Sequence, residues 1–260
     1  MNWFEALILG LIQGLTEFLP VSSSGHLEIG KVLLNTEVKE NLTFAIVVHG
    51  ATVLSTILVF RKEIWKIIIE LFDFKWNDST KYTAKILVSM IPVVIVGLFF
   101  KEEVERFFTG NMILVGSMLF ITSLLLIFTY LSKNNTKEIS FIHAFIIGIA
   151  QAFAVLPGIS RSGATIATGI LLGNKKEDLA KFSFLMVLIP IIAANFLDLL
   201  KNNETVVAKI DMSSLVIGFI AAFVTGFLAC KWMISIVKKG KLIYFGIYCF
   251  IVGVIAVFFL

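Results

Sequence analysis

The chain has 260 residues, of which 58% are hydrophobic and 15% are charged, and its formal net charge is +4. Its mean hydropathy is +0.96. A water-soluble globule of this length needs more polar residues to cover its surface, so the composition excludes that class and indicates an integral membrane protein.

In chain order, the first predicted element is a broken helix, LGLIQGLTEFLPVSSSGHL, which starts at Leu9. Apolar runs follow, and each is close to the roughly 20 residues that cross hydrocarbon as a helix. A second broken helix, IGIAQAFAVLPGISRSGAT, starts at Ile147. The six predicted spans are 43–60, 82–100, 111–131, 180–200, 212–236 and 242–260.

The two broken segments are copies of one pattern. At an offset of 138 residues, 7 of the 27 positions from Asn2 to Glu28 are identical. The shared residues include Gln13 with Gln151, and Ser22, Ser24 and Gly25 with their counterparts Ser160, Ser162 and Gly163. We therefore expect repeats at about 1–131 and 139–260 within a single membrane domain, 1–260.

Basic residues in the loops predict the orientation of the spans. If both broken segments are re-entrant hairpins, 13 basic residues fall on one side and 6 on the other, and the richer side should be cytoplasmic. The first set is Arg61, Lys62, Lys66, Lys75, Lys81, Lys133, Lys137, Lys175, Lys176, Lys181, Lys238, Lys239 and Lys241, and the second is Lys31, Lys39, Lys101, Arg106, Lys201 and Lys209.

This arrangement predicts an all-α polytopic membrane protein with six full transmembrane helices and two re-entrant hairpins of inverted topology. The hairpins enter from opposite sides, so their broken ends should meet near the bilayer midplane. Half-helix ends at that depth present backbone groups to a polar ligand.

The first hairpin carries acidic, hydroxyl and imidazole groups. Gln13 and Glu17 are four residues apart and share a helix face. Pro20 ends the helix, and Ser22, Ser23 and Ser24 are good N-caps for the next one, with Gly25 allowing close backbone approach. Ser23 and His26 are three apart and should also share a face.

The second hairpin carries a cation. Pro157 and Gly158 break the helix, and Ser160 and Ser162 can cap the next one. Arg161 is a planar cation suited to phosphate, and Thr165 adds a hydroxyl one turn later. Because Glu17 and Arg161 are costly at membrane depth, they need each other, a ligand or water as partners.

Purely structural roles are the alternatives. The serines could be helix caps only, His26 a hydrogen-bonded structural histidine, and Arg161 a pin between the hairpins through Glu17. For Gln151 we expect a bond to Gln13 across the pseudo-twofold axis. For His49 and Pro190, packing is at least as good an explanation as lining a cavity.

The motifs at 13–26, QGLTEFLPVSSSGH, and at 157–165, PGISRSGAT, resemble the two signatures of the bacterial undecaprenyl-diphosphatase family, also called bacitracin-resistance proteins. The resemblance implies a multi-pass plasma-membrane phosphatase that opens to the outer face and depends on a divalent cation. It would hydrolyse undecaprenyl diphosphate to the monophosphate and so recycle the cell-wall lipid carrier. The family's acidic motif falls on Gln13 and Glu17, which leaves one carboxylate here.

The family's other motif residues fall on Ser22, Ser23, His26, Ser160 and Arg161. We predict Glu17, Ser23, His26 and Arg161 as catalytic residues and Glu17 as a ligand of Mg²⁺, with Ca²⁺ as a substitute. The predicted substrate-binding residues are Gln13, Ser22, Ser24, Gly25, Ser160, Ser162, Gly163 and Thr165.

The mechanistic hypothesis has Ser23 attacking the terminal phosphorus. Glu17 takes its proton or binds the metal, and His26 transfers a proton to the leaving group or to water. A phospho-histidine at His26 and direct attack by water are the competing versions.

Two other functions share parts of the pattern. An inverted-repeat transporter or flippase of a lipid phosphate would use the same architecture. The type-2 phosphatidic acid phosphatases share SerGlyHis and SerArg, but this chain lacks their third motif. The expected partners are the polyprenyl diphosphate substrate and membrane lipids, with a homodimer allowed and no nucleic acid.

Overall fold

The computed structural model describes residues 1–34, 41–108, 110–132, 135–201 and 211–260, and for 41, 42, 105 and 197–201 it describes the backbone alone. Within these ranges the chain is helical, and its sole β-pairing is an isolated bridge between Lys137 and Asn174. The predicted all-α membrane fold is confirmed. Lys39, Lys133 and Lys209 of the charge analysis lie outside the described residues.

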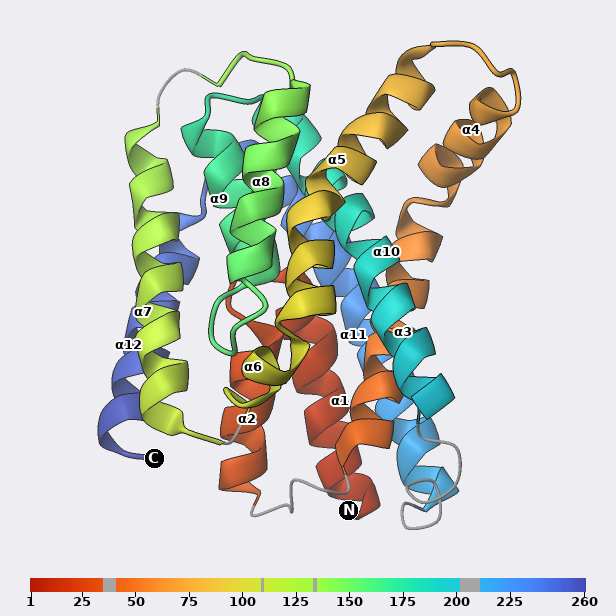
Figure 1. Ribbon diagram of the computed structural model, residues 1–260. Coiled ribbons are helices and arrows are strands. Elements are labelled where there is room, and N and C mark those ends of the chain that lie inside the picture. Colours follow the sequence, from red (N-terminus) through yellow and green to blue (C-terminus); the bar gives the residue numbers. More distant parts are fainter. Residues whose placement is uncertain (35–40, 109, 133–134, 202–210) are drawn as a thin grey trace.

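Helices coincide with all six predicted spans. These helices are α3 (Asn41–Val59), α5 (Asp78–Phe99), α7 (Met112–Phe128), α10 (Lys176–Lys201), α11 (Met212–Lys239) and α12 (Ile243–Phe258). In Figure 1, α10 and α11 run along most of the molecule, whereas α3 ends part-way along it and the chain continues into the next helix.

By length and apolarity, 4 of the described helices can cross a membrane, and α3 joined to the following helix would be a fifth. At 16 residues, α12 is shorter than this criterion requires. The protein is therefore a multi-pass membrane protein, and the count of six complete crossings stays a prediction.

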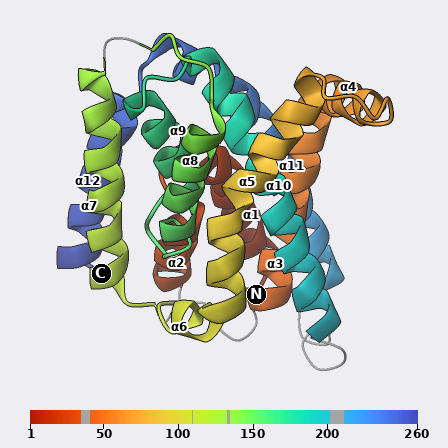
Figure 2. The same cartoon turned by 45° about the horizontal axis from the view of Figure 1, so that its top comes forward.

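Two short helices lie in segments that the sequence analysis treated as loops. They are α4 (Arg61–Leu71) and α6 (Lys101–Glu105). The axis of α4 is bent by 74° from that of α3, and none of its residues is buried. It lies at the periphery, beside the end of α5 (Figure 2). A helix that combines Ile and Trp with Lys and Glu, as α4 does, suits the boundary between headgroups and acyl chains.

Each broken segment is a helical hairpin that turns back inside the molecule. The first comprises α1 (Trp3–Phe18) and α2 (Ser23–Leu33), and the second comprises α8 (Phe141–Phe153) and α9 (Arg161–Leu171). In Figure 1 the first hairpin rises from the end that carries both termini, and the second descends from the opposite end. Their breaks meet in the interior, as the inverted topology predicts.

Both hairpins pack against a long helix through a close contact at an equivalent glycine. Gly10 of α1 packs on the backbone of Gly218 in α11, and Gly148 of α8 packs on the backbone of Ser89 in α5. Gly10 and Gly148 are 138 residues apart, so each repeat presses the same position against a long helix. A side chain at either position would collide with backbone. The repeat boundaries themselves stay a prediction.

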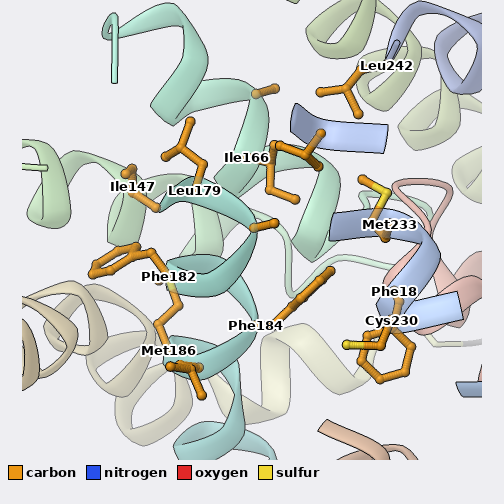
Figure 3. Close-up of a cluster of buried hydrophobic side chains, with 14 of the residues drawn as sticks. Phe18, Ile147, Ile166, Leu179, Phe182, Phe184, Met186, Cys230, Met233 and Leu242 are labelled. Carbon is orange, nitrogen blue, oxygen red and sulfur yellow. The ribbon is translucent and has the colours of Figure 1, made fainter. Parts of the chain in front are cut away.

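The largest hydrophobic cluster packs residues of both hairpins against the long helices. Figure 3 shows Phe182, Phe184 and Met186 of α10 directed into this cluster together with side chains of α9 and α11. Phe18, just before the first break, meets Phe184 edge-on with ring centroids 5.4 Å apart. Cys230 and Cys249 are both free and buried, as apolar packing residues are.

The predicted sidedness can be tested by cysteine labelling. Lys75 lies between α4 and α5, and Arg106 follows α6, and both are exposed. In intact cells, a membrane-impermeant maleimide should label Arg106→Cys at once, and Lys75→Cys only after permeabilisation. The buried native cysteines should give little background, and the unsubstituted protein measures it. The opposite labelling pattern would reverse the orientation.

Candidate active site

The first break is built around Ser22. Leu19 caps α1 in an extended conformation, and Ser22 has φ 71° and ψ 96°, in the region that favours glycine. The Ser22 hydroxyl accepts a hydrogen bond from Gly25 N at 3.3 Å, which makes it the N-cap of α2. Ser23 is therefore the first helical residue, and its side chain starts at a half-helix N-terminus.

The second break repeats this capping. Gly158 has φ 98°, and Ser160 accepts a hydrogen bond from Gly163 N at 3.0 Å, so that α9 begins at Arg161. In each hairpin the cap hydroxyl lies 3.3 Å from the serine hydroxyl two residues later. Thr122 of α7 fixes this second break by accepting from Ser160 N and donating to Gly158 O.

The two breaks touch through small residues. A Cβ added at Gly25 would lie 3.1 Å from Gly158 Cα, and one added at Gly163 would lie 3.3 Å from Pro20 Cβ. At the offset of 138, Gly25 corresponds to Gly163 and Pro20 to Gly158, so these are the same contact made twice. The helix starts of α2 and α9 are thereby brought together.

Glu17 is the centre of the polar cluster at this contact. One carboxylate oxygen accepts from Ser23 Oγ at 2.6 Å and from Gln13 Nε2 at 2.9 Å. The other accepts from Arg161 Nη2 at 3.0 Å. The Glu17 side chain is 7% exposed and that of Arg161 is 28% exposed. The predicted proximity of Arg161 to Glu17 and Ser23 is confirmed.

A cavity of about 280 Å³ opens beside this cluster. Glu17, Ser23 and Ser24 line it from the first hairpin, and Ser160 and Arg161 line it from the second. Phe108, in the segment after α6, also lines it, so the cavity reaches toward the end that carries both termini (Figure 1). Its lining combines polar groups such as Glu17 and Arg161 with apolar ones such as Val93 and Val187, which suits an amphiphilic ligand.

The chain that forms this arrangement of two capped helix starts, one carboxylate and one guanidinium matches a known family in sequence. The sequence model of the bacitracin resistance protein BacA family matches residues 6–255. The chain belongs to the BacA family.

Curated relatives of this BacA-family chain carry one name. A protein from Bacteroides fragilis called undecaprenyl-diphosphatase is 60% identical over 99% of this chain and 98% of its own length. A protein of the same name from Parabacteroides distasonis is 59% identical with the same coverage. One from Christiangramia forsetii is 54% identical over 100% of this chain and 98% of its own length.

His26 lies apart from the other predicted catalytic residues of this BacA-family chain. It is absent from the cavity lining. Its Nδ1 lies 2.9 Å from Ser22 O and its Nε2 lies 2.8 Å from the Tyr248 hydroxyl of α12. Ser23 instead bonds Glu17, so these two side chains have different partners despite their three-residue spacing. The catalytic role of His26 stays a prediction.

The predicted substrate-binding residues divide into two groups. Ser24 and Ser160 line the cavity. The other six make contacts within the protein: Ser22, Gly25 and Gly163 as described, Gln13 by donating to Glu17, Ser162 by donating to Leu19 O, and Thr165 by donating to Arg161 O. These contacts hold the two helix starts in place. Direct contact with substrate stays a prediction for every member of the set.

The expected bond between the two glutamines is not formed. Gln13 donates to Glu17 at 2.9 Å, while both amide atoms of Gln151 are buried without a hydrogen-bond partner. The pairing failed because Gln13 has a carboxylate four residues away on its own helix, and a charged acceptor binds more strongly than a neutral amide. Gln151 instead lines the cavity with Arg161.

Sequence reasoning also underestimated His49 and missed Tyr248. His49 Nε2 lies 3.9 Å from Glu17 Oε2, and its Nδ1 donates to Ala45 O at 2.8 Å. The sequence signal for a functional role of His49 was its position as a histidine within an apolar span. Tyr248 is 222 residues from His26, and nothing local to its helix distinguishes it from other lipid-facing tyrosines. Pro190 lines the cavity as well.

The oxygen atoms of Glu17 and Gln13 suit a magnesium ion that is also bound by a ligand. Among the residues that the structure describes, no three His, Cys, Asp or Glu side chains gather as a metal cage. Magnesium binds through one or two carboxylates together with phosphate oxygens and water. Glu17 offers the carboxylate, and Gln13 Oε1 is buried without a hydrogen-bond partner. These residues therefore fit a cation that arrives with a diphosphate.

The Glu17–Arg161 pair predicts a stability effect separate from activity. Arg161→Met should lower the free energy of unfolding by about 3 kcal/mol, because it leaves a buried carboxylate unpaired. Adding Glu17→Gln should recover most of this loss, since the amide carries no charge to compensate. The unfolding midpoint in detergent measures both. Equal midpoints for the parent and the single variant would show that the pair does not stabilise the fold.

Proposed function

We propose that this BacA-family protein hydrolyses undecaprenyl diphosphate to undecaprenyl phosphate and inorganic phosphate. The reaction would take place in the plasma membrane, with the site open to its outer face. It would return the lipid carrier to cell-wall synthesis and thereby give resistance to bacitracin. The observation that carries the proposal is the Ser23–Glu17–Arg161 cluster at two helix starts, beside a cavity with apolar walls.

Charge neutralisation is the first requirement of this reaction. A diphosphate is strongly anionic, and its transfer demands positive groups around the transferred phosphoryl. Arg161 supplies a guanidinium, and the first turns of α2 and α9 direct N–H groups and positive dipole ends toward the same region. A bound Mg²⁺, held by Glu17 and Gln13, would supply further neutralisation of the phosphate charge.

Ser23 is the proposed nucleophile. Its hydroxyl donates to Glu17 Oε2 at 2.6 Å, so the carboxylate is placed to take the proton as Oγ attacks. The new Oγ–P bond forms while the P–O bond to the bridging oxygen breaks, and undecaprenyl phosphate leaves. Water then cleaves the phosphoserine and releases phosphate. Arg161 bonds Glu17 in the structure and would turn toward the phosphate when substrate enters.

A phosphohistidine at His26 and direct attack by water remain the competing chemical routes. The bonds of His26 to Ser22 O and Tyr248, and its absence from the cavity lining, favour serine over histidine. The short hydrogen bond between Ser23 and Glu17 argues against a carrier that only moves a lipid phosphate, because transport requires no activated hydroxyl.

Phosphate release by purified protein in detergent tests the function and the roles together. With C55 diphosphate, Ser23→Ala and Glu17→Gln should each lower kcat at least about 100-fold. Arg161→Gln should lower kcat and raise KM, because the Arg161 guanidinium would bind the diphosphate in both the ground state and the transition state. Ser117→Ala is the matched control, because the Ser117 hydroxyl bonds Ile113 O of its own helix.

Two outcomes would count against the proposal. Absence of phosphate release by the unsubstituted protein with any divalent cation would favour a carrier, because no gradient exists in detergent. Acid-stable phosphoenzyme, trapped by rapid quenching, should carry its label on Ser23, whereas acid-labile label on His26 would establish the histidine route.

Cation dependence gives a separate prediction. Chelation with EDTA should abolish phosphate release, and Mg²⁺ should restore it, with Ca²⁺ as a partial substitute. Gln13→Ala should raise the Mg²⁺ concentration needed for half-maximal rate by about tenfold, on the scale of a lost supporting contact to a metal site. Full activity in excess EDTA would remove the metal from the mechanism.

A further inference from the structure

His26 joins two segments that are far apart in sequence. Its ring lies against that of Tyr248, with centroids 5.5 Å apart and planes 10° apart. Nε2 is 2.8 Å from the Tyr248 hydroxyl, and Nδ1 is 2.9 Å from Ser22 O. Both ring nitrogens are therefore used in contacts within the protein.

The chemistry of these partners fixes the protons. A carbonyl oxygen can only accept, so His26 Nδ1 carries a hydrogen and donates it to Ser22 O. In the neutral ring, Nε2 is then the acceptor, and the Tyr248 hydroxyl donates to it. A directed chain results, from Tyr248 through the imidazole to the Ser22 carbonyl.

The end of this chain is the strained residue of the first break. Ser22 has φ 71°, a backbone conformation that is strained for a non-glycine residue and persists only where surrounding contacts enforce it. Its carbonyl belongs to the peptide that leads into Ser23. The orientation of that peptide sets where Ser23 Oγ points, and in the structure it points to Glu17 Oε2 at 2.6 Å.

We infer that Tyr248 is a positioning residue that acts through His26, holding the Ser22 peptide so that Ser23 Oγ stays aimed at Glu17. Neither Tyr248 nor His26 lines the cavity, so the pair acts on the placement of the nucleophile and leaves substrate binding unchanged. This inference rests on the proposed phosphatase function with Ser23 as its nucleophile.

The first test removes one hydroxyl. Tyr248→Phe should lower kcat for phosphate release about tenfold, the scale of one lost hydrogen bond to a functional group, with KM changed less than about twofold. Tyr244→Phe is the matched control, because Tyr244 lies one turn earlier on α12 with 65% of its surface exposed. Its kinetics should equal those of the parent protein.

The second test separates positioning from proton transfer at His26. An asparagine amide can occupy the place of Nδ1 and donate to Ser22 O, but it does not titrate. His26→Asn should therefore keep about a tenth of the parent kcat, and His26→Ala should keep about a hundredth or less. If His26 carried a proton or a phosphoryl group, the two variants would be equally inactive, which would overturn the inference.

A double-mutant cycle gives the decisive readout. In the His26→Asn protein, Tyr248 has lost its acceptor, so adding Tyr248→Phe should change kcat less than about twofold. A further tenfold loss would show that Tyr248 acts independently of His26 and would refute the chain. The cycle stays informative if Tyr248→Phe alone lowers the unfolding midpoint. A purely structural defect would lower kcat in the parent protein and in the His26→Asn protein alike.

These outcomes are distinct from a failure of the proposed function. If the unsubstituted protein releases no phosphate from C55 diphosphate, the function fails first. If it is active and Tyr248→Phe equals both the parent and Tyr244→Phe, the positioning role fails while the phosphatase assignment stands.

Discussion

The structure depends on the pairing of Glu17 with Arg161 inside a membrane-embedded bundle. A charged side chain at this depth is costly, and an acid and a base held 3.0 Å apart reduce the cost for both. One residue comes from each hairpin, so the pair forms only where the two breaks meet. The same contact that makes the charges tolerable also assembles the polar site.

The breaks in the two hairpins bring Glu17 and Arg161 together. In a continuous span, the backbone N–H and C=O groups hydrogen-bond to one another within the helix. An interrupted helix leaves some of these groups free at the break, and nearby residues must provide their partners. Ser22 and Ser160 do so as N-caps, and Thr122 does so for the second break. The glycines at the crossing then let the two helix starts approach each other closely.

The first hairpin carries Glu17, Ser23 and His26 and the second carries Arg161, although both have the same capping geometry. At the offset of 138 residues, Ser23 corresponds to Arg161, and Glu17 corresponds to Val155. The repeat thus supplies two equivalent helix starts, and substitution at a few positions gives them different chemistry.

The sequence alone determined the membrane class, the six apolar helices, the two broken segments and the motif residues, because hydropathy and a helix break are local properties. It also predicted that Glu17 and Arg161 need partners, with each other, a ligand or water as the candidates, since charges at membrane depth are costly. Tertiary structure decided the contacts between distant segments: His26 faces Tyr248 rather than the cavity, His49 approaches Glu17, and Gln151 is left without Gln13. These depend on how helices rotate and pack against one another, and neither spacing nor composition encodes that rotation.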